Sequence, residues 1–121
     1  MPRIADYSII DHSAKYGNFD GNSTQISIGF QLPNTLDKES RSILAWMMNV
    51  PDGGVNLSVH INQHQIHNSH HDDGYFGPMF QVVSSGFLHR GPDNSVIFTF
   101  DVGATEKLFV SNVVLWWQAN I

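Results

Sequence analysis

Histidine is the residue type in this chain that most suggests chemistry. The sequence of 121 residues contains seven histidines, and five of them lie between positions 60 and 71. These five are His60, His64, His67, His70 and His71. Imidazole nitrogens bind transition metals, exchange protons near neutral pH and hydrogen-bond organic ligands. The segment 60–71 is therefore the first place to look for a functional site.

The spacing of the first histidines predicts a β-hairpin. In segment 55–62 the odd positions are aliphatic and the even positions are polar, which is typical of a strand with one buried face. A two-residue turn at Gln63 and His64 would pair His60 with His67, and both would emerge on the polar face with Cβ atoms about 5 Å apart. Because this dipeptide is not of the Asn-Gly type, a longer loop with a shifted register is the alternative.

A metal site is one interpretation of the cluster. The predicted ligands are His60, His67, His70 and His71, and the carboxylates of Asp72 and Asp73 follow directly. Zn²⁺, Ni²⁺ and Cu²⁺ accept such nitrogen and oxygen ligands. The spacing matches no zinc-finger or zincin motif. Two other interpretations therefore stay open: a polar surface hydrogen-bonded to water, and histidines that contact an organic ligand or act as acid and base.

The elements that must position these residues are β-strands. Segment 96–102 repeats the two-residue period, and its residues Val96, Phe98, Phe100 and Val102 point one way. Weaker strand candidates, separated by turn-forming residues, are Tyr7–Ile10, Thr24–Gln31, Ser42–Val50, Pro78–Ser84 and Lys107–Gln118. No stretch has the apolar stripe of a helix. About eight short strands predict an all-β fold, a single-domain antiparallel β-sandwich (jelly roll) spanning residues 1–121.

Two segments do not alternate. Residues 43–48 and 113–117 are apolar at nearly every position. This pattern predicts central strands whose second face is covered by a loop, a ligand or a second subunit. Ordinary core with loop cover is the first expectation, and a homo-oligomer is the alternative.

The charge balance excludes some partners. Six basic and eleven acidic residues give a formal charge of −5, which repels nucleic acid and anionic membranes. The absence of cysteine excludes a disulfide framework and a thiolate metal site. The N-terminus lacks a signal-peptide pattern, and no apolar run reaches the ~20 residues of a membrane span. We expect a soluble protein, cytoplasmic by default.

Strand 55–62 ends in Val-x-Ile-Asn, and Leu88-His89-Arg90-Gly91 is followed by Asn94 and a hydrophobic strand. In these motifs the second half of the chain resembles the galactose-binding-like jelly-roll superfamily, to which many carbohydrate-binding modules belong. The resemblance implies a jelly-roll fold. It also implies a ligand, often a carbohydrate, bound by loops at one end of the sandwich or on a concave face. Some members are enzymes, so the resemblance leaves catalysis undecided.

A carbohydrate-binding, lectin-like protein with a histidine-rich surface is the function predicted first. Polar groups would hydrogen-bond sugar hydroxyls and aromatic rings would stack on the sugar ring. The residues predicted to bind the ligand are His60, Asn62, His67, Tyr75, Arg90 and Trp117. The alternative is a small enzyme that uses histidine acid–base chemistry, or a histidine-bound metal, on a small molecule in a pocket of the sandwich. An assembly protein is the third class. No cofactor other than that transition metal is indicated.

Overall fold

The computed structural model describes residues 3–11, 15–17, 24–49, 55–71, 76–101 and 108–120. These residues form nine β-strands and one short 3-10 helix, η1. The strands are β1 (Arg3–Asp11), β2 (Lys15–Gly17), β3 (Thr24–Leu32), β4 (Arg41–Asn49), β5 (Val55–Ile61), β6 (His64–His71), β7 (Phe76–Ser84), β8 (Gly91–Asp101) and β9 (Leu108–Asn120), and η1 is Ser85–Phe87. No helix in this part of the chain is long and apolar enough to cross a membrane.

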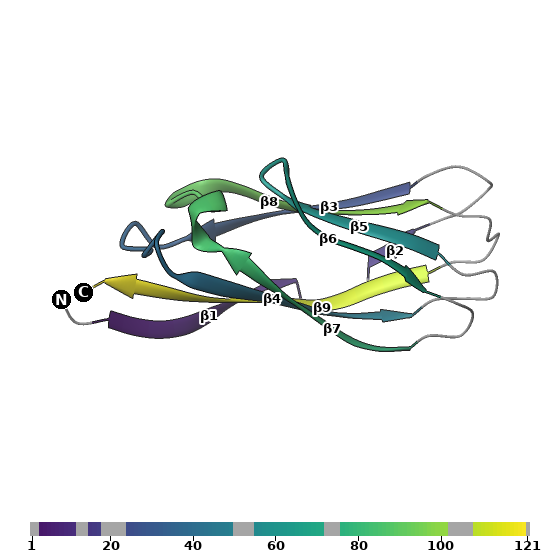
Figure 1. Ribbon diagram of the computed structural model, residues 1–121, viewed down its shortest axis with the longest axis horizontal. Helices are drawn as coiled ribbons and strands as arrows, with labels where there is room; N and C mark the ends of the chain where they lie inside the picture. The colour runs from purple at the N-terminus through teal and green to yellow at the C-terminus, as the bar shows by residue number, and fades with distance from the viewer. Residues whose placement is uncertain are drawn as a thin grey trace.

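The strands form two facing sheets (Figure 1). The first sheet has the order β1-β9-β4-β7, with β2 also paired to β9, and the second has the order β3-β8-β5-β6. Every strand pair is antiparallel. The predicted antiparallel jelly-roll sandwich is therefore confirmed. The structure has one strand more than predicted because two separate segments, β1 and β2, pair with the long strand β9.

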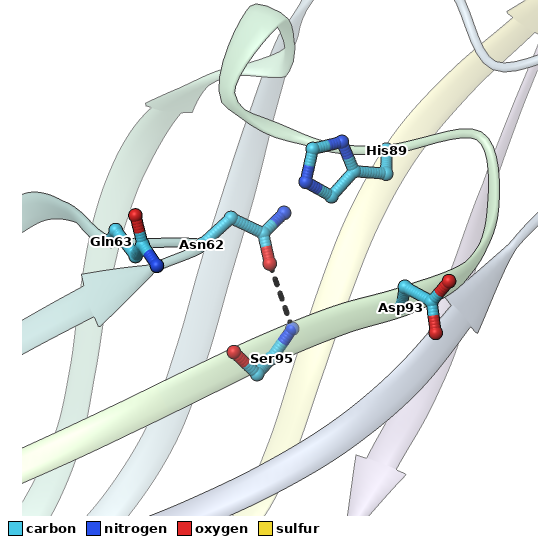
Figure 2. A pocket seen from close by; sticks show the side chains of 5 residues that line it. All are labelled: Asn62, Gln63, His89, Asp93 and Ser95. Atoms are coloured by element: carbon cyan, nitrogen blue, oxygen red, sulfur yellow. Dashed lines mark hydrogen bonds between the residues drawn. The ribbon is translucent and has the colours of Figure 1, made fainter.

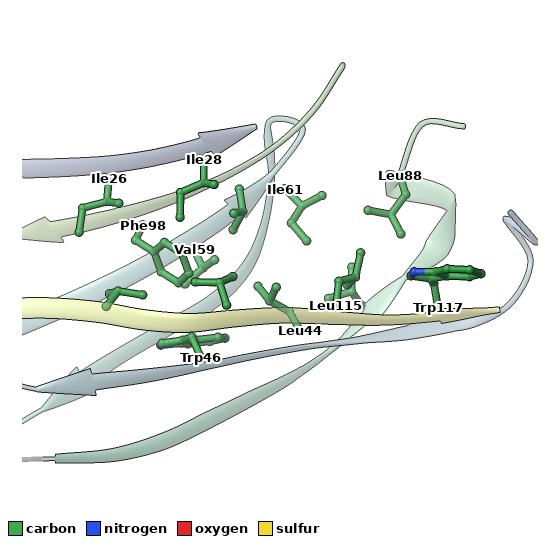
Figure 3. Packing of buried hydrophobic residues seen from close by; sticks show 14 of the residues in the cluster. Ile26, Ile28, Leu44, Trp46, Val59, Ile61, Leu88, Phe98, Leu115 and Trp117 are labelled. Atoms are coloured by element: carbon green, nitrogen blue, oxygen red, sulfur yellow. The ribbon is translucent and has the colours of Figure 1, made fainter. Parts of the chain in front are cut away.

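The core lies between the two sheets (Figure 3). Val96, Phe98 and Phe100 are completely buried, as the two-residue period of this segment predicts, whereas Val102 lies outside the described residues. Phe98 meets Trp46 of the opposite sheet edge to face, with ring centroids 5.4 Å apart. Buried aromatic pairs of this geometry add to the free energy of hydrophobic burial. The core therefore joins the two sheets.

The two doubly apolar segments form the central strands β4 and β9 of the first sheet. Their inner residues, such as Leu44 and Leu115, are completely buried. Their outer residues are not: Ile43 is 41% exposed and Trp116 is 40% exposed. The loop cover that we expected is thus not present over these side chains within the described part of the chain.

The β5–β6 hairpin differs from the prediction in its register. Its turn consists of Asn62 and Gln63, with φ angles of 47° and 75°. His60 pairs with Gln65, and after a bulge Val59 pairs with His67. The predicted pairing of His60 with His67 is therefore wrong. The two-residue turn falls one residue earlier, because Asn accepts the left-handed conformation that such turns require.

Candidate functional site

A polar hollow of about 330 Å³ lies at the end of the sandwich where the β5–β6 hairpin turns (Figure 2). Its lining residues are Asn62, Gln63, His89, Asp93 and Ser95. Two come from the hairpin turn, one from the segment after η1, and two from the start of β8. Two segments that are distant in sequence, the hairpin turn and the stretch from η1 into β8, therefore build one site.

Asn94 braces the loop that carries His89. The Asn94 side chain is almost completely buried. Its Oδ1 accepts a hydrogen bond from the backbone N–H of His89 at 2.8 Å, and its Nδ2 donates to the carbonyl oxygens of His89 at 2.8 Å and Gly91 at 3.3 Å. A buried amide with these partners holds the loop in one shape. The position of His89 at the rim is consequently fixed.

Asn62 joins the hairpin turn to this braced loop. Its Nδ2 donates to Asn94 Oδ1 at 2.8 Å and to the carbonyl oxygen of Phe87 at 3.0 Å. Its Oδ1 accepts from the backbone N–H of Ser95 at 2.9 Å, as the dashed line in Figure 2 marks. Both N–H groups of the Asn62 amide and one lone pair of its oxygen are engaged by these bonds. Asn62 therefore shapes the hollow and leaves ligand contacts to its neighbours.

The η1 segment also packs directly against the hairpin. The rings of His64 and Phe87 stack almost in parallel, with centroids 4.2 Å apart and an interplanar angle of 7°. Stacking between a flat imidazole and an aromatic ring adds dispersion contact to the hydrogen bonds of Asn62. The wall of the hollow is thus held by both polar and apolar contacts.

Left-handed backbone conformations gather around the hollow, and the one at Gln63 is strained because glutamine, unlike Asn and Asp, rarely adopts it. Asn62, Gln63 and Asp93 all have positive φ, with 72° at Asp93, and Asn112 is the one other such non-glycine position in the described residues. Left-handed conformations are unfavourable for residues with a Cβ and tend to cluster at functional sites. The concentration of left-handed conformations at the rim is an independent indication of a binding site.

Four polar side chains remain for a ligand. They are Gln63, His89, Asp93 and Ser95, and no hydrogen bond to a described residue engages their side-chain polar atoms. Together they present an amide, an imidazole, a carboxylate and a hydroxyl. This set can both donate and accept hydrogen bonds. The hollow is suited to a small molecule with many hydroxyl groups.

A second hollow of about 420 Å³ shares Asp93 with the first as a lining residue. Its lining residues are Gly29, Phe30, Gln31, Pro92, Asp93 and Asn94. Because Asp93 and Asn94 belong to the same turn as the first site, one extended ligand could contact both hollows. Phe30, which is half-buried, supplies an apolar surface there.

Most of the predicted ligand residues lie elsewhere. Of the six, only Asn62 lines the first hollow. His60 faces outward from β5, and His67 faces inward from β6. The side chain of Arg90 donates from Nε to the carbonyl oxygen of Leu36 at 2.9 Å. Trp117 is buried and donates from Nε1 to Ser8 Oγ at 2.9 Å. Tyr75 lies outside the described residues.

Three residues of β6 that point between the sheets form a hydrogen-bonded row. The Nε2 atoms of His67 and His71 each lie 2.8 Å from Ser69 Oγ. His67 Nδ1 lies 3.0 Å from Oε1 of Gln81 on β7. The imidazole of His67 also meets Trp46 edge to face, with centroids 5.4 Å apart. The row therefore links an edge strand of one sheet to the other sheet.

The predicted metal ligands divide between the two faces of β5 and β6. His60 and His70 lie on the outer face, where His70 Nδ1 is 2.7 Å from Asn56 Oδ1, whereas His67 and His71 lie on the inner face. No three histidine or carboxylate side chains in the described residues converge to hold a metal ion. The bulge in the hairpin therefore separates the four predicted ligands between two faces. Metal binding by His60, His67, His70 and His71, and histidine catalysis, stay predictions.

Partial burial lowers the pKa of His71 below its usual value of 6.5, and the charges of His67 and His70 lower it further. The neutral form of His71 is consequently favoured in the folded protein. This agrees with its place in a row of neutral hydrogen-bonding groups. This lowered pKa belongs to a residue of the row on β6, and His71 does not line the hollow at the hairpin turn.

Sequence reasoning missed four residues of the hollow: Gln63, His89, Asp93 and Ser95. Two signals could have found them. His89 and Asp93 belong to the Leu-x-x-Gly…Asn stretch on which the resemblance rests, and this stretch forms one end of the sandwich. Gln63 follows Asn62 in the hairpin turn. Polar loop residues held by a rigid scaffold are frequent ligand contacts.

No protein-family model matches this sequence, and no curated protein sequence matches it. Several solved structures share its fold. A dimeric latent PorU from Porphyromonas gingivalis has a TM-score of 0.63 and 9% identity, and the match covers 99% of this chain and 13% of that one. The chain thus spans only a small part of PorU.

Two carbohydrate-binding modules match over nearly their whole length. The family 29 module CBM29_1 from Piromyces equi has a TM-score of 0.53 and 10% identity, covering 96% of this chain and 91% of the module. The CBM36-1 domain of a xylanase from the hindgut metagenome of Trinervitermes trinervoides has a TM-score of 0.51 and 8% identity, covering 99% and 100%. The chain therefore has the jelly-roll fold of carbohydrate-binding modules, as the sequence resemblance implied.

Proposed function

We propose that this protein binds a neutral carbohydrate in the hollow formed by Asn62, Gln63, His89, Asp93 and Ser95. The observation that carries the proposal is a rigid, polar hollow at one end of the sandwich, with hydrogen-bonding groups at its rim that no described residue engages. Preorganised polar groups of this kind fix the orientation of a ligand at small entropic cost.

The chemistry of the rim suits a sugar. Each hydroxyl of a sugar both donates and accepts a hydrogen bond, so a ring needs mixed partners. The Asp93 carboxylate accepts, the Gln63 amide does both, and the Ser95 hydroxyl does both. A charged acceptor such as Asp93 forms stronger hydrogen bonds than a neutral one. Asp93 is therefore the residue on which binding depends most.

Electrostatics favour a neutral ligand. Asp93 carries the negative charge of the rim, and the whole chain has a formal charge of −5. Both repel a carboxylated or sulfated sugar before contact is made. No Arg or Lys is among the described residues that line the hollow. This also favours a neutral ligand, because proteins hold acidic sugars with Arg or Lys side chains.

The second hollow beside Asp93 supports a ligand of more than one sugar unit. It adds Phe30 and Pro92 as apolar surface and Gln31 as a polar group. A second ring resting there would keep its hydrogen bond to Asp93 while gaining apolar contact. We therefore expect affinity to rise from monosaccharide to disaccharide. The shared fold with carbohydrate-binding modules agrees with this function, but a fold alone does not determine one.

The test is a glycan array followed by isothermal titration of the best glycan with two rim variants. Asp93→Asn retains a residue that tolerates positive φ and removes the charged acceptor. We expect it to weaken binding about 10-fold or more, since hydrogen bonds to charged groups contribute ~1.5–3 kcal/mol. His89→Gln should weaken binding as well.

Matched controls separate the hollow from the rest of the surface. Asp6→Asn on β1 and His60→Gln on the outer face of β5 make the same chemical changes away from the site. Both should bind as the wild type does. If the array retains no neutral glycan, or if Asp93→Asn binds like the wild type, the proposed site is wrong.

A further inference from the structure

The outer face of the first sheet carries a continuous apolar patch. Its members come from all four long strands of that sheet and are paired across it. They are Tyr7, Ile9, Ile43, Phe80, Val82 and Trp116. These side chains are between 40% and 63% exposed, whereas charged residues normally cover such a sheet face. We call this set the apolar face.

The patch runs across the strands without a break. Trp116 of β9 pairs with Tyr7 on one side and with Ile43 on the other, and Ile43 pairs with Val82 of β7. The ring centroids of Tyr7 and Trp116 are 6.2 Å apart, and the planes of the two rings are tilted by 42°. Cross-strand neighbours lie about 5 Å apart, so these side chains form one surface.

The size of the apolar face can be compared with what a protein interface needs. With roughly 200 Å² of surface for a whole aromatic side chain, Tyr7, Phe80 and Trp116 together expose about 300 Å². A whole aliphatic side chain has ~100 Å² of surface, and Ile9, Ile43 and Val82 are each about half exposed. They raise the exposed apolar area of the face to about 450 Å². A standard interface has ~800 Å² per partner, of which about 65% is apolar at the core.

We infer that the apolar face binds a second copy of this chain, with the first sheets of the two copies packed face to face about a two-fold axis. The exposed apolar area nearly equals the apolar core of a standard interface. Because Ile43 and Trp116 lie at the centre of the sheet, each would pack near its own counterpart in an isologous contact. Sheets that pack this way lie ~10 Å apart.

The charges on this face favour a second copy over other occupants. Arg41 lies at its end, but no charged side chain stands among the described residues that pair across its centre. Two copies can therefore meet without burying an unpaired charge. A lipid surface is disfavoured because membrane-binding faces need a rim of cations, and this chain has a formal charge of −5.

The dimer would place the second sheets of both copies on its outside. The hollow of the proposed function lies on the second sheet, so the apolar face and the hollow do not compete. The two hollows of a dimer would then engage a multivalent glycan together, which strengthens binding without any new contact. The dimer itself is inferred independently of the carbohydrate ligand.

Sedimentation velocity of the full chain tests the inference, with loading concentrations that bracket a dissociation constant of roughly 1 μM, which corresponds to about −8 kcal/mol. We expect the wild type to be dimeric at about ten times that concentration. Phe80→Lys places two ammonium groups in the interface, and it should weaken dimerisation at least 10-fold. Ser27→Lys, on the exposed outer face of the other sheet, is the matched control and should remain dimeric.

Hydroxyl-radical footprinting of the wild type keeps the test decisive if Phe80→Lys fails to fold. Labelling of Tyr7, Phe80 and Trp116 should fall as the protein concentration rises through the dissociation constant. A chain that stays monomeric, or a dimer in which these three side chains remain equally labelled, would overturn the inference. A monomer that co-sediments with phosphatidylcholine vesicles would also overturn it, and would assign the face to a lipid surface.

Discussion

At the scale of single residues, one glutamine amide determines the tautomers of two histidines. Gln81 Nε2 donates to the carbonyl oxygen of Val82 at 3.0 Å, so its Oε1 accepts from His67 Nδ1. Neutral His67 therefore presents a lone pair at Nε2, which accepts from the hydroxyl of Ser69. The Ser69 oxygen then accepts from Nε2–H of His71. The Nε2–H of His71 can donate to Ser69 whether His71 is neutral or protonated.

The burial of His71 makes folding stability depend on pH in the mildly acidic range. His71 has a lowered pKa in the folded protein because of its burial and the charges of His67 and His70, while the unfolded chain binds this proton near pH 6.5. The unfolded state thus binds more protons below about pH 6.5, so the contribution is complete above that value and is lost as the pH falls through the lowered pKa.

We expect His71→Gln to flatten the pH dependence of thermal stability. The melting temperature of the wild type should fall more steeply between pH 7.5 and pH 5.5 than that of the variant. Differential scanning calorimetry across this range measures the difference. Asn68→Gln, which changes an exposed side chain of the same strand and removes no titrating group, is the control and should keep the wild-type slope. Equal slopes for His71→Gln and the wild type would show that His71 does not titrate in this way.

At the scale of elements, the β5–β6 hairpin combines a favourable and an unfavourable turn residue. Asn62 at φ 47° is common in such turns, whereas Gln63 at φ 75° stands where glycine is strongly preferred. The strain at Gln63 persists because the turn is fixed by Asn62 and by the His64–Phe87 stack. A residue kept at an unfavourable conformation beside a hollow is consistent with a role in binding.

Gln63→Gly should therefore separate stability from binding. We expect the variant to be more stable by about 1 kcal/mol, because glycine adopts positive φ without strain, and to bind the glycan more weakly because the amide is lost. Denaturant unfolding and titration measure the two effects. Gln65→Gly, in strand β6, is the matched control and should lose about 0.5–1 kcal/mol. A Gln63→Gly variant that is less stable than the wild type would contradict the strain argument.

At the scale of the whole molecule, the two sheets differ in what their outer faces can do. The second sheet carries polar residues outward and holds the hollow near its hairpin end, while the first sheet presents the apolar face. Both sheets contribute to one core through Trp46 and Phe98 (Figure 3). The sandwich therefore unfolds as a unit, and a core residue supports both faces.

Phe98→Ala should destabilise the entire fold. We expect a loss of about 3–5 kcal/mol, since the side chain is completely buried and would leave a cavity against Trp46. Ile97→Ala, one residue earlier and only partly buried on the outer side of the same strand, should cost much less. Urea unfolding followed by circular dichroism compares them. Similar losses in both variants would mean that the faces of β8 are assigned incorrectly.

The sequence by itself determined the strands and the inward-facing residues. Alternation in segments 55–62 and 96–102 is a local property, because successive side chains of a strand point to opposite faces. The resemblance in Leu88-His89-Arg90-Gly91 and Asn94 likewise identified the turn that Asn94 braces. The continuous apolar pattern of segments 43–48 and 113–117 also predicted that they are central strands. It did not predict that their outer face stays exposed.

Only the tertiary structure decided the register of the hairpin and the composition of the hollow. A shift of one residue moves a side chain to the other face, and the bulge between Gln65 and His67 of β6 placed His67 inside. The hollow joins Asn62 to Ser95, which are 33 positions apart in the chain. Such contacts depend on which strands become neighbours in the sheets. The packing of the entire core determines this arrangement, and no local sequence pattern encodes it.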